Sequence, residues 1–265
     1  MARALFDDLE NIRARLARAS NLFIVLDFDG TLTRILEKPG NVWLDTDTRR
    51  LVTDLSRQPH VKVVVASGRG LDDLRLRVGI PNLIYIGNHG LEMNGPCFTF
   101  DRIAPLTTEQ DLCRIAASLR DQLAGVPGVE LENKRLSIGV HHRMTPTEMV
   151  DRVREVIARC LSGWPGFRVL DGLKVFDIQP NIDWNKGTAS AWLRRVLGLE
   201  SALSICIGDD RTDEDMFRAL VEGITIKVGA DEASAAHYCV PDSGAVRRFL
   251  QWLLECPLSS AAAPM

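Results

Sequence analysis

The sequence predicts an α/β fold in which a parallel central sheet carries a smaller inserted α+β domain. Apolar strand-like segments alternate with helical ones in the first part of the chain and again near its end, which is typical of a parallel sheet covered on both faces. Between these parts the strands become half-polar, as in a sheet with one exposed face. We therefore expect a core of residues 1–106 and 173–265 and an inserted domain of residues 107–172.

The core elements follow from apolar runs rich in Val, Ile and Leu, separated by amphipathic stretches. Each apolar run is bounded by Gly, Asn, Asp or Pro, residues that end strands. The expected strands are residues 22–28, 61–67, 82–88, 173–180, 202–210 and 223–229, and the expected helices are residues 1–20, 46–57, a short one from 70, 184–198 and 212–220.

The inserted segment has a different pattern. We expect helices from about residue 107 and over 147–160, and strands over 136–142 and 167–171. Strand alternation places Ser137, His141 and Arg143 on one face and a core-like set, Leu136, Ile138, Val140 and His142, on the other. The first face suits either solvent or a polar ligand. His141 and His142 point in opposite directions, which argues against a shared metal.

Composition excludes several classes of protein. The chain has 265 residues, of which 46% are hydrophobic, so it can bury a large core. A net charge of −3 gives no broad basic surface for nucleic acid or a membrane. Six scattered cysteines lack metal-finger spacing, and no segment has the length of a membrane span. We expect a soluble, cytoplasmic protein, with a monomer as the favoured state.

Polar side chains follow four of the expected core strands. Because the carboxyl ends of parallel strands meet at one edge of a sheet, these side chains are expected to converge. Any one of them alone could simply be a polar residue that ends a strand, but the four together indicate a site. They are Asp27 with Asp29, Ser67, Asn88 with His89, and Asp209 with Asp210.

Aspartates gathered at one point require a cation, because like charges raise one another's pKa. Mg²⁺ fits this need, since it binds carboxylate and phosphate oxygens. Beside it, Asp27 and Asp29 make sense as a nucleophile and an acid/base that act on a phosphoryl group. Lys186 can supply a further cation and Ser67 a hydroxyl donor.

The motifs "DFDGT", "VASGR", Lys186 and "IGDDRTDED" resemble the four ordered motifs of haloacid dehalogenase superfamily phosphatases. This resemblance implies a Rossmann-like core of haloacid dehalogenase type with a cap domain. The segments "GNHGLE", "LENKRLSIGVHHR", "DIQPNIDWNKGTA" and "GDDRTDEDMF" are similar to those of the trehalose-6-phosphate phosphatase family. The resemblance covers residues 24–229.

The resemblance implies a role for each catalytic residue. Asp27 would form an aspartyl-phosphate, and Asp29 would protonate the leaving sugar and then activate water. Mg²⁺ would be held by Asp27, Asp209 and the main-chain oxygen of Asp29. Ser67 and Lys186 would hold the phosphoryl oxygens. Asp210 and Asp213 would lie beside the metal.

The same resemblance implies a sugar phosphate, trehalose 6-phosphate, as the small-molecule substrate. The family usually has Glu in place of Asp177 and a basic residue in place of Gln179, so other sugar phosphates, such as sucrose phosphate or mannosylphosphoglycerate, stay open. A catalytically silent regulator is a third reading, against which the complete catalytic set argues. The implied substrate-binding residues are Arg69, Asn88, His89, Glu92, Glu132, Lys134, Ser137, His141, Arg143 and Asp177.

Overall fold

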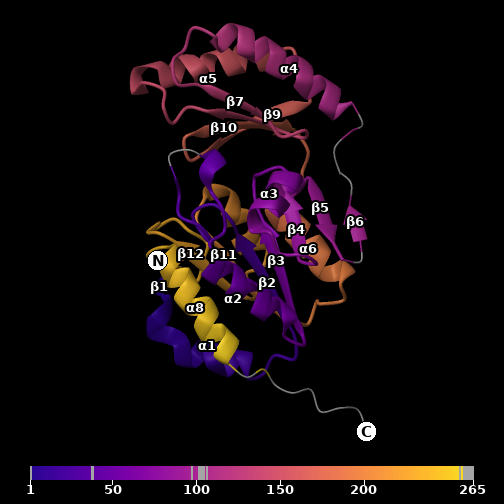
Figure 1. The fold of residues 1–265 in the computed structure, drawn as a ribbon, viewed down its shortest axis with the longest axis vertical. Helices are drawn as coiled ribbons and strands as arrows, with labels where there is room; N and C mark the ends of the chain where they lie inside the picture. Colours follow the sequence, from indigo (N-terminus) through magenta and orange to yellow (C-terminus); the bar gives the residue numbers. More distant parts are fainter. Residues whose placement is uncertain are drawn as a thin grey trace. The chain divides into compact units, whose positions relative to one another are not determined.

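A computed structural model describes residues 2–36, 39–96, 98–100, 105, 107–256 and 258. The chain forms two compact units (Figure 1). We call Met1–Asp101 with Trp184–Met265 the core unit and Arg102–Asp183 the small unit. None of the helices in the described part of the chain is both long and apolar enough to cross a membrane.

The core unit is built on a sheet of nine strands among the described residues. Neighbouring strands are parallel from β1 to β4, and β5 and β6 add an antiparallel edge. In spatial order the strands are β1 (Arg3–Ala4), β13 (Tyr238–Val240), β12 (Ile224–Val228), β11 (Leu203–Gly208), β2 (Leu22–Asp27), β3 (Val61–Ala66), β4 (Ile84–Gly87), β5 (Glu92–Gly95) and β6 (Phe98–Phe100).

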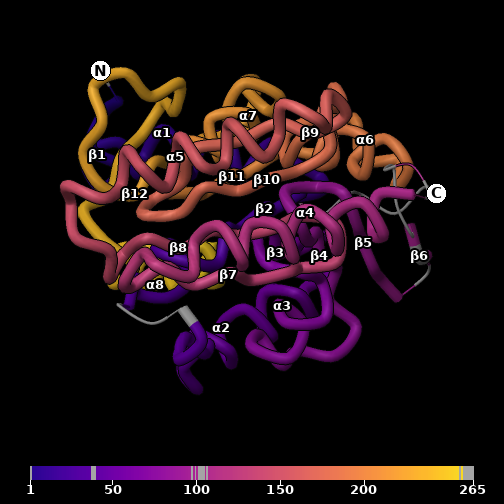
Figure 2. Tube along the Cα trace, turned by 90° about the horizontal axis from the view of Figure 1, so that it is seen from above, coloured from indigo at the N-terminus to yellow at the C-terminus, as the bar shows by residue number. Residues whose placement is uncertain are grey.

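Helices cover both faces of this sheet, so its strands are apolar at nearly every position. Ile24 packs on the face covered by α1 (Leu9–Leu16), α2 (Thr46–Arg57), α3 (Leu71–Val78) and α8 (Ser243–Glu255). The next residue, Val25, packs on the face covered by α6 (Lys186–Val196) and α7 (Glu214–Ala219). Figure 2 shows α2, α3 and α8 on one side of β2 and β3, and α6 and α7 on the other.

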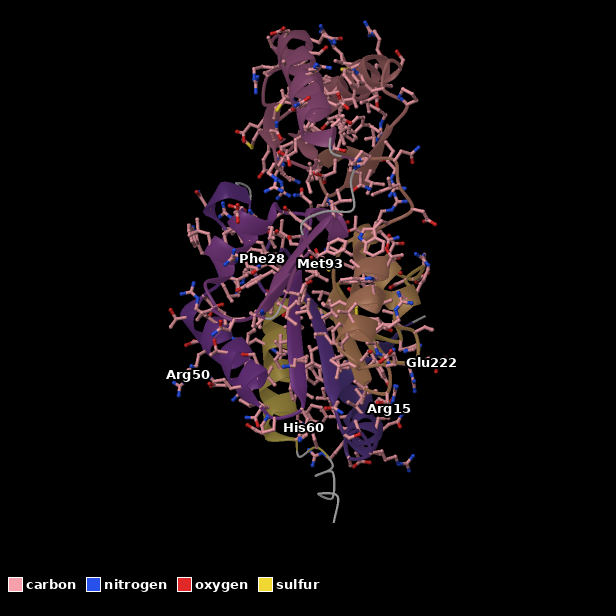
Figure 3. The ribbon with its side chains drawn as sticks, turned by 90° about the vertical axis from the view of Figure 1, so that its right-hand side faces the viewer. Arg15, Phe28, Arg50, His60, Met93 and Glu222 are labelled. Atoms are coloured by element: carbon pink, nitrogen blue, oxygen red, sulfur yellow. The ribbon has the colours of Figure 1, made fainter. Side chains whose placement is uncertain are left out.

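The predicted α/β class with a mainly parallel sheet is confirmed. Several elements were not predicted, namely the long helix α8, the strands β1, β5, β6, β7 (Glu130–Asn133) and β13, and the short helices η1 (Leu5–Asp8), η2 (Pro39–Asn41), η3 (Asn88–Gly90) and η4 (Arg211–Asp213). The opening helix is shorter than expected, and β1 precedes it at the sheet edge. Arg15 on α1 donates to the main-chain oxygens of Glu222 and Gly223 and so ties this helix to the rest of the unit (Figure 3).

The small unit is an antiparallel sheet with two helices on one face. The helices α4 (Thr108–Leu123) and α5 (Thr147–Leu161) pack together over Ile138, Val140 and Phe176. Leu136, Ile138, Val140 and His142 are buried, as predicted, and the His142 ring stacks on Phe176. In spatial order the strands are β7 (Glu130–Asn133), β8 (Ile138–His141), β10 (Val175–Pro180) and β9 (Phe167–Gly172).

Both predicted boundaries of the inserted domain differ from the structure: the small unit begins at Arg102 and not at residue 107, and the larger error is at its other end. Residues 173–180 were assigned to the core, but β10 lies between β8 and β9 in the small sheet, and the small unit runs to Asp183. Apolar and polar residues alternate in this segment, and Phe176 and Ile178 lie in the apolar core of the small unit. That alternation predicts a strand but does not say which sheet the strand joins, because pairing partners are set by tertiary structure.

Candidate active site

The order in which strands are added to the large sheet reverses at β2. From β2, successive strands run outward through β3 and β4, while β11, β12 and β13 lie on the other side. Ligands bind in the crevice that such a switch point opens beyond the carboxyl ends of the strands. Asp27 is the last residue of β2, Ser67 follows β3, and Asp209 follows β11. The sheet therefore brings these three sequence-predicted residues to one edge.

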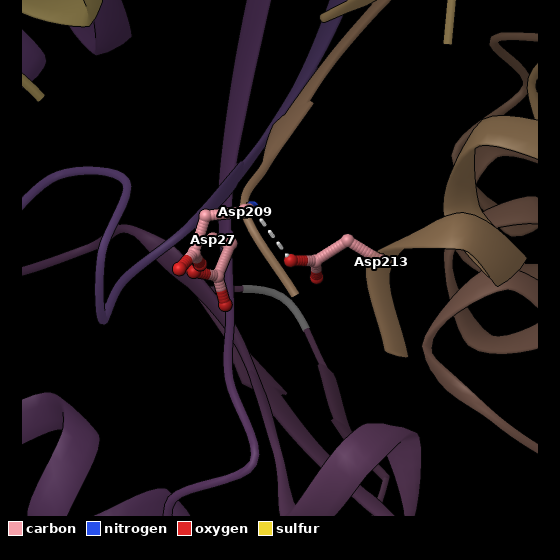
Figure 4. A group of neighbouring side chains, drawn as sticks. All are labelled: Asp27, Asp209 and Asp213. Carbon is pink, nitrogen blue, oxygen red and sulfur yellow. Dashed lines mark hydrogen bonds between the residues drawn. The ribbon is translucent and has the colours of Figure 1, made fainter. Parts of the chain in front are cut away.

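Lys186 is the cation at the centre of this edge. Its ammonium donates to Asp27 Oδ1 at 2.6 Å and to Asp213 Oδ1 at 2.8 Å. All three side chains are buried, with Lys186 only 3% exposed. Figure 4 shows Asp27 and Asp209 side by side, with Asp213 reaching them from η4. A buried ammonium between two carboxylates is a charge cluster, which costs free energy to assemble and is typical of functional sites.

The segment "WNKG" explains how Lys186 reaches this position. Trp184 donates its indole N–H to the main-chain oxygen of Gly90, and Asn185 caps α6 with Thr188 in a reciprocal capping box. Gly187 is required because a Cβ there would lie 2.1 Å from a main-chain oxygen of α7. A lysine in the first turn of a helix opposes the macrodipole. The ion pairs with Asp27 and Asp213 therefore stabilise Lys186 at this position.

Asp213 organises the loop that carries the other aspartates. Its Oδ2 accepts the main-chain N–H groups of Asp209 and Asp210, at 3.0 and 2.9 Å. Gly208 leaves room for this carboxylate, since a Cβ there would lie 2.5 Å from Asp213 Oδ2. Gly30, at a φ of +84°, leaves comparable room for the Asp209 carboxylate. Asp210 is itself the cap of η4, and its side chain accepts the main-chain N–H of Arg211.

Two carboxylate oxygens at this edge are left without a donor. Within the described residues, no hydrogen-bond donor reaches Asp27 Oδ2 or Asp209 Oδ1, although both atoms are buried. Buried oxygens of this kind are normally satisfied. Asp27, Asp209 and Asp213 have oxygens within 4.8 Å of one another, but Asp213 already accepts from Lys186 and two amides. The donor set fits a hard divalent cation on Asp27 and Asp209.

The pKa values of Asp27 and Asp209 also indicate that the negative charge of this cluster is not fully balanced. Burial and the charge of Asp213 raise the pKa of Asp27 well above its ordinary value, even though Lys186 opposes the shift. Burial, Asp213 and Asp210 raise the pKa of Asp209 to about 7. Burial alone would lower the pKa of Lys186, but Asp213 and Asp27 raise it, so this lysine stays charged. A further cation would relieve the aspartates.

Asp29 belongs to a neighbouring cluster. Both of its oxygens accept from Arg69, from Nε and Nη2 at 2.7 Å each, and the third arm of Arg69 binds Asp73 at 2.9 Å. The guanidinium lies 5.6 Å from the centre of the Phe28 ring. Ser67 is buried beside it and accepts the main-chain N–H of Arg69 at 3.2 Å. The fork geometry fixes the direction of the Asp29 carboxylate.

The segment that follows β4 carries three of the predicted substrate-binding residues, Asn88, His89 and Glu92. Asn88 donates to Glu92 Oε1 at 2.5 Å, and the same oxygen accepts the N–H of Leu71 at the start of α3. Asn88 and His89 have φ values of 46° and 56°. A left-handed backbone is uncommon for residues other than glycine, although Asn and His adopt it more readily than most, and backbone strain of this kind clusters at functional sites. All three side chains are buried.

In the small unit, the polar face of the sheet carries two pairs. Lys134 donates to Asp177 Oδ1 at 2.7 Å, and the His141 ring lies 2.8 Å from Glu132 Oε2. Gly139 lies opposite Glu132 and Asp177 in the register, and a Cβ there would lie 3.1 Å from His141 Nε2 and 3.3 Å from Lys134 Nζ. The ion pair directs the Asp177 carboxylate at Lys134. Of the other predicted residues, Ser137 is buried and Arg143 donates to the main-chain oxygen of Leu173.

Sequence reasoning missed three charged residues next to the site. Asp73 holds Arg69, Lys227 donates to the main-chain oxygen of Asp209, and Glu214 lies 4.0 Å from Lys227. Lys227 gave a signal, because a lysine inside the apolar run "ITIKV" of a central strand must be buried and paired. Asp73 and Glu214 lie in ordinary charged helix starts, which give no such signal.

The fold is that of haloacid dehalogenase-like hydrolases. A haloacid dehalogenase-like hydrolase from Bacteroides thetaiotaomicron has the same fold, with a TM-score of 0.63 and 16% identity over 88% of this chain and 100% of that chain. The family model described as trehalose-phosphatase matches residues 25–243. The chain belongs to the trehalose-phosphatase family.

Two relatives show the extent of the match. Trehalose-phosphate phosphatase B of Arabidopsis thaliana is 29% identical over 95% of this chain and 70% of that protein. Trehalose-phosphate phosphatase of Mycobacterium bovis (strain BCG / Pasteur 1173P2) is 35% identical over 89% of this chain and 63% of that protein. The chain thus spans about two thirds of the length of these relatives.

Proposed function

We propose that this chain is a Mg²⁺-dependent phosphatase that hydrolyses trehalose 6-phosphate to trehalose and phosphate through an aspartyl-phosphate on Asp27. The observation that carries the proposal is the pair of buried, donor-free oxygens on Asp27 and Asp209 among the described residues, beside the charged Lys186. Family membership and the relatives' names support the substrate. A small-molecule sugar phosphate is the partner, and we retain a monomeric, cytoplasmic enzyme as the expectation.

Asp27 and Asp209 would hold the metal through these oxygens, with the main-chain oxygen of Asp29 as the third protein ligand. Bound Mg²⁺ would supply positive charge to the phosphoryl oxygens as they approach the carboxylates. Lys186 adds a fixed ammonium on the other side of Asp27, and Ser67 adds a hydroxyl. Asp213 acts by aiming Lys186 and the Asp209 main chain.

In the first step, a carboxylate oxygen of Asp27 forms a bond to phosphorus while the bond from phosphorus to the sugar oxygen breaks. Asp29 gives a proton to that departing oxygen. In the second step, Asp29 takes a proton from water, the water oxygen bonds to phosphorus, and the bond to Asp27 breaks to release phosphate. Splitting the reaction in this way replaces one hard displacement with two easier ones.

Arg69 sets a condition on the role of Asp29. Both Asp29 oxygens accept from Arg69 in this structure, so proton donation requires one of these bonds to be exchanged for the sugar oxygen. Arg69 was predicted to bind substrate, and its contacts support a second task, orientation of Asp29. Asn88 and Glu92 likewise bond to each other and to α3, a contact that supports a rigid floor beneath the phosphoryl group.

The polar face of the small unit is the proposed sugar-binding surface. Glu132, Lys134, His141 and Asp177 supply both donors and acceptors, which hydroxyl groups need. The Lys134–Asp177 pair is 7% and 6% exposed, so its atoms are already oriented. This orientation supports a phosphatase that is specific for one sugar phosphate rather than a general phosphatase.

The covalent step is tested by trapping. The protein is incubated with Mg²⁺ and beryllium fluoride, an aspartyl-phosphate mimic, and the adduct is located by crystallography. It is expected on Asp27. Asp27→Asn keeps the shape of the side chain but not its nucleophile, so turnover should fall by at least about three orders of magnitude, with the melting temperature retained. Wild-type-like turnover of Asp27→Asn would contradict the proposal that Asp27 is the nucleophile.

Two alternatives are separable from the leading proposal. A phosphatase for sucrose phosphate or mannosylphosphoglycerate would form the same Asp27 adduct but prefer a different sugar phosphate. A silent regulator would bind sugar phosphate and release no phosphate from any substrate. No contact among the described residues favours either one over the leading proposal.

A further inference from the structure

Lys227 is a buried lysine that the proposed reaction does not use. It lies in β12, next to Gly208 of β11 in the parallel register, and its side chain is 6% exposed. Its ammonium donates to the main-chain oxygen of Asp209 at 2.6 Å and lies 4.0 Å from Glu214 Oε1. Burying a charge is costly unless it is paired and hydrogen-bonded. The question is what this contact holds in place.

The contact completes a clamp on Asp209. The N–H of Asp209 donates to Asp213 Oδ2 at 3.0 Å, and its main-chain oxygen accepts from Lys227. The peptide groups on both sides of the Asp209 Cα are thus tied to buried side chains. These ties fix the direction of the Cα–Cβ bond, and the close approach of Gly30 fixes where the carboxylate can lie. The donor-free oxygen Oδ1 is therefore aimed by main-chain contacts.

Glu214 anchors the other end of the clamp. Its Oε1 accepts the hydroxyl of Ser234 and its Oε2 accepts the N–H of Ala235, each at 2.7 Å. Glu214 begins α7, just after Asp213 ends η4. The pair of Lys227 and Glu214 consequently joins β12, α7 and the turn at residues 234–235 around the Asp209 main-chain oxygen.

We infer that Lys227 is a positioning residue for the metal ligand Asp209, an inference that rests on the metal binding in the proposed function. Residues that orient a metal ligand typically change metal affinity by about 10- to 100-fold when removed. Loss of the Lys227 ammonium should therefore weaken Mg²⁺ binding by that factor. It should change kcat at saturating Mg²⁺ much less, because Lys227 touches neither substrate nor the reacting atoms.

The experiment measures metal binding directly. Mg²⁺ is titrated calorimetrically into the metal-free full chain, without substrate, and its concentration dependence is then measured in the phosphatase assay. Lys227→Met removes the donor and keeps the volume, whereas Lys227→Arg keeps a donor and a charge. Thr225→Val is the matched control, since Thr225 is buried on the same strand and accepts the N–H of His237, away from Asp209.

We expect Lys227→Met to raise the Mg²⁺ Kd at least tenfold, Lys227→Arg to recover most of the affinity, and Thr225→Val to match the wild type. An unchanged Kd in Lys227→Met, or an equal loss in Thr225→Val, overturns the inference, because either result means a purely structural role. If Lys227→Met does not fold, Lys227→Leu, which also lacks a donor, carries the same expectation and the same refutation. A wild-type chain that binds no Mg²⁺ overturns the metal proposal itself, and this inference with it.

Discussion

At the scale of single residues, three carboxylates cluster at the edge of the sheet and two of them bind one ammonium. Lys186 binds Asp27 and Asp213, Asp209 lies beside them, and the oxygens that no described donor reaches belong to Asp27 and Asp209. Asp27, Asp209 and Lys186 were predicted from the sequence, because polar residues at the ends of buried strands and at the start of a helix have a shared position in this architecture. Asp213 was expected beside the metal only from the family resemblance.

Other residue pairings were not predictable. Arg69 and Asp29 lie far apart in the sequence, and only the packed structure shows that the guanidinium holds both Asp29 oxygens. Lys134 and Asp177 likewise meet only because β7 and β10 flank β8. Charge type and strand position can be inferred from a sequence, but the rotamer that pairs two long side chains depends on the tertiary packing around them.

The first prediction concerns Asp209 and pH. Its pKa is raised from 3.8 to about 7, so between those values the folded metal-free chain binds more protons than the unfolded chain. The contribution of this group to stability is thus largest near pH 4 and is lost as pH rises through about 7. Asp209→Asn lacks the ionisation. In chelator at pH 8 it should melt several degrees above the wild type, and the gap should close towards pH 4.

Thermal unfolding across this pH range measures the effect. Excess Mg²⁺ should reverse the order at pH 8, because the metal stabilises the wild type and binds the variant weakly. Asp209→Asn should also lose activity. A metal-free variant that melts below the wild type at pH 8 would contradict the view that this carboxylate is uncompensated.

At the scale of elements, helix starts place the functional groups. The capping box of Asn185 and Thr188 begins α6 with Lys186 at its first position, and the motif that specifies it was visible in the sequence. The assignment of residues 173–180 failed at this scale. A strand with alternating apolar residues satisfies the core of either sheet, so composition alone does not choose between them.

The second prediction tests a cap far from the chemistry. Asp45 accepts the N–H groups of Asp47 and Thr48 and so caps α2. Burial opposes these hydrogen bonds, but together with the Thr48 hydroxyl and Arg247 they lower the pKa of Asp45. Asp45→Ala should cost about 1 kcal/mol of unfolding free energy at pH 7. The electrostatic part is present above the unfolded pKa of about 4 and is lost as pH falls through the lower folded value.

Denaturant unfolding at pH 7 and below pH 4 measures this cost. Asp45→Asn serves as the control, since it keeps an acceptor without the charge and should lose less stability at pH 7. Phosphatase kcat should be unchanged in both variants. A stability loss for Asp45→Ala that is equally large at both pH values would show that the carboxylate charge contributes nothing.

At the scale of the whole molecule, our proposal assigns chemistry and recognition to different units. The core unit contains the carboxylates and Lys186, and the small unit contains the polar face with Glu132, Lys134 and Asp177. The existence of both units follows from the change in strand pattern along the sequence. Their boundary does not, because β10 returns to the small sheet before the chain rejoins the core.

The third prediction separates the two tasks. Glu132→Ala and Lys134→Ala should each lower kcat/KM for trehalose 6-phosphate by one to two orders of magnitude, since a lost charged hydrogen bond costs about 1.5–3 kcal/mol. A small aryl phosphate, which makes few contacts, should be nearly unaffected. Lys186→Ala should damage both substrates. Asp177→Glu should leave turnover equal or better if this side chain faces the sugar.

Steady-state kinetics with both substrates checks this prediction. Arg154→Ala is the matched control, because it removes an exposed ion pair with Asp171 in the same unit without touching the polar face. It should behave like the wild type on both substrates. Equal losses on both substrates for Glu132→Ala and Lys134→Ala would mean that this face supports the fold and does not recognise the sugar.

The most direct test of the central claim is phosphate release across a panel of phosphate esters, with Mg²⁺ and with chelator. The panel contains trehalose 6-phosphate, sucrose phosphate, mannosylphosphoglycerate, glucose 6-phosphate and an aryl phosphate. Our account predicts the highest kcat/KM for trehalose 6-phosphate, loss of activity in chelator and its return on adding Mg²⁺. A higher kcat/KM for another ester, full activity in chelator, or no phosphate release from any ester would contradict it.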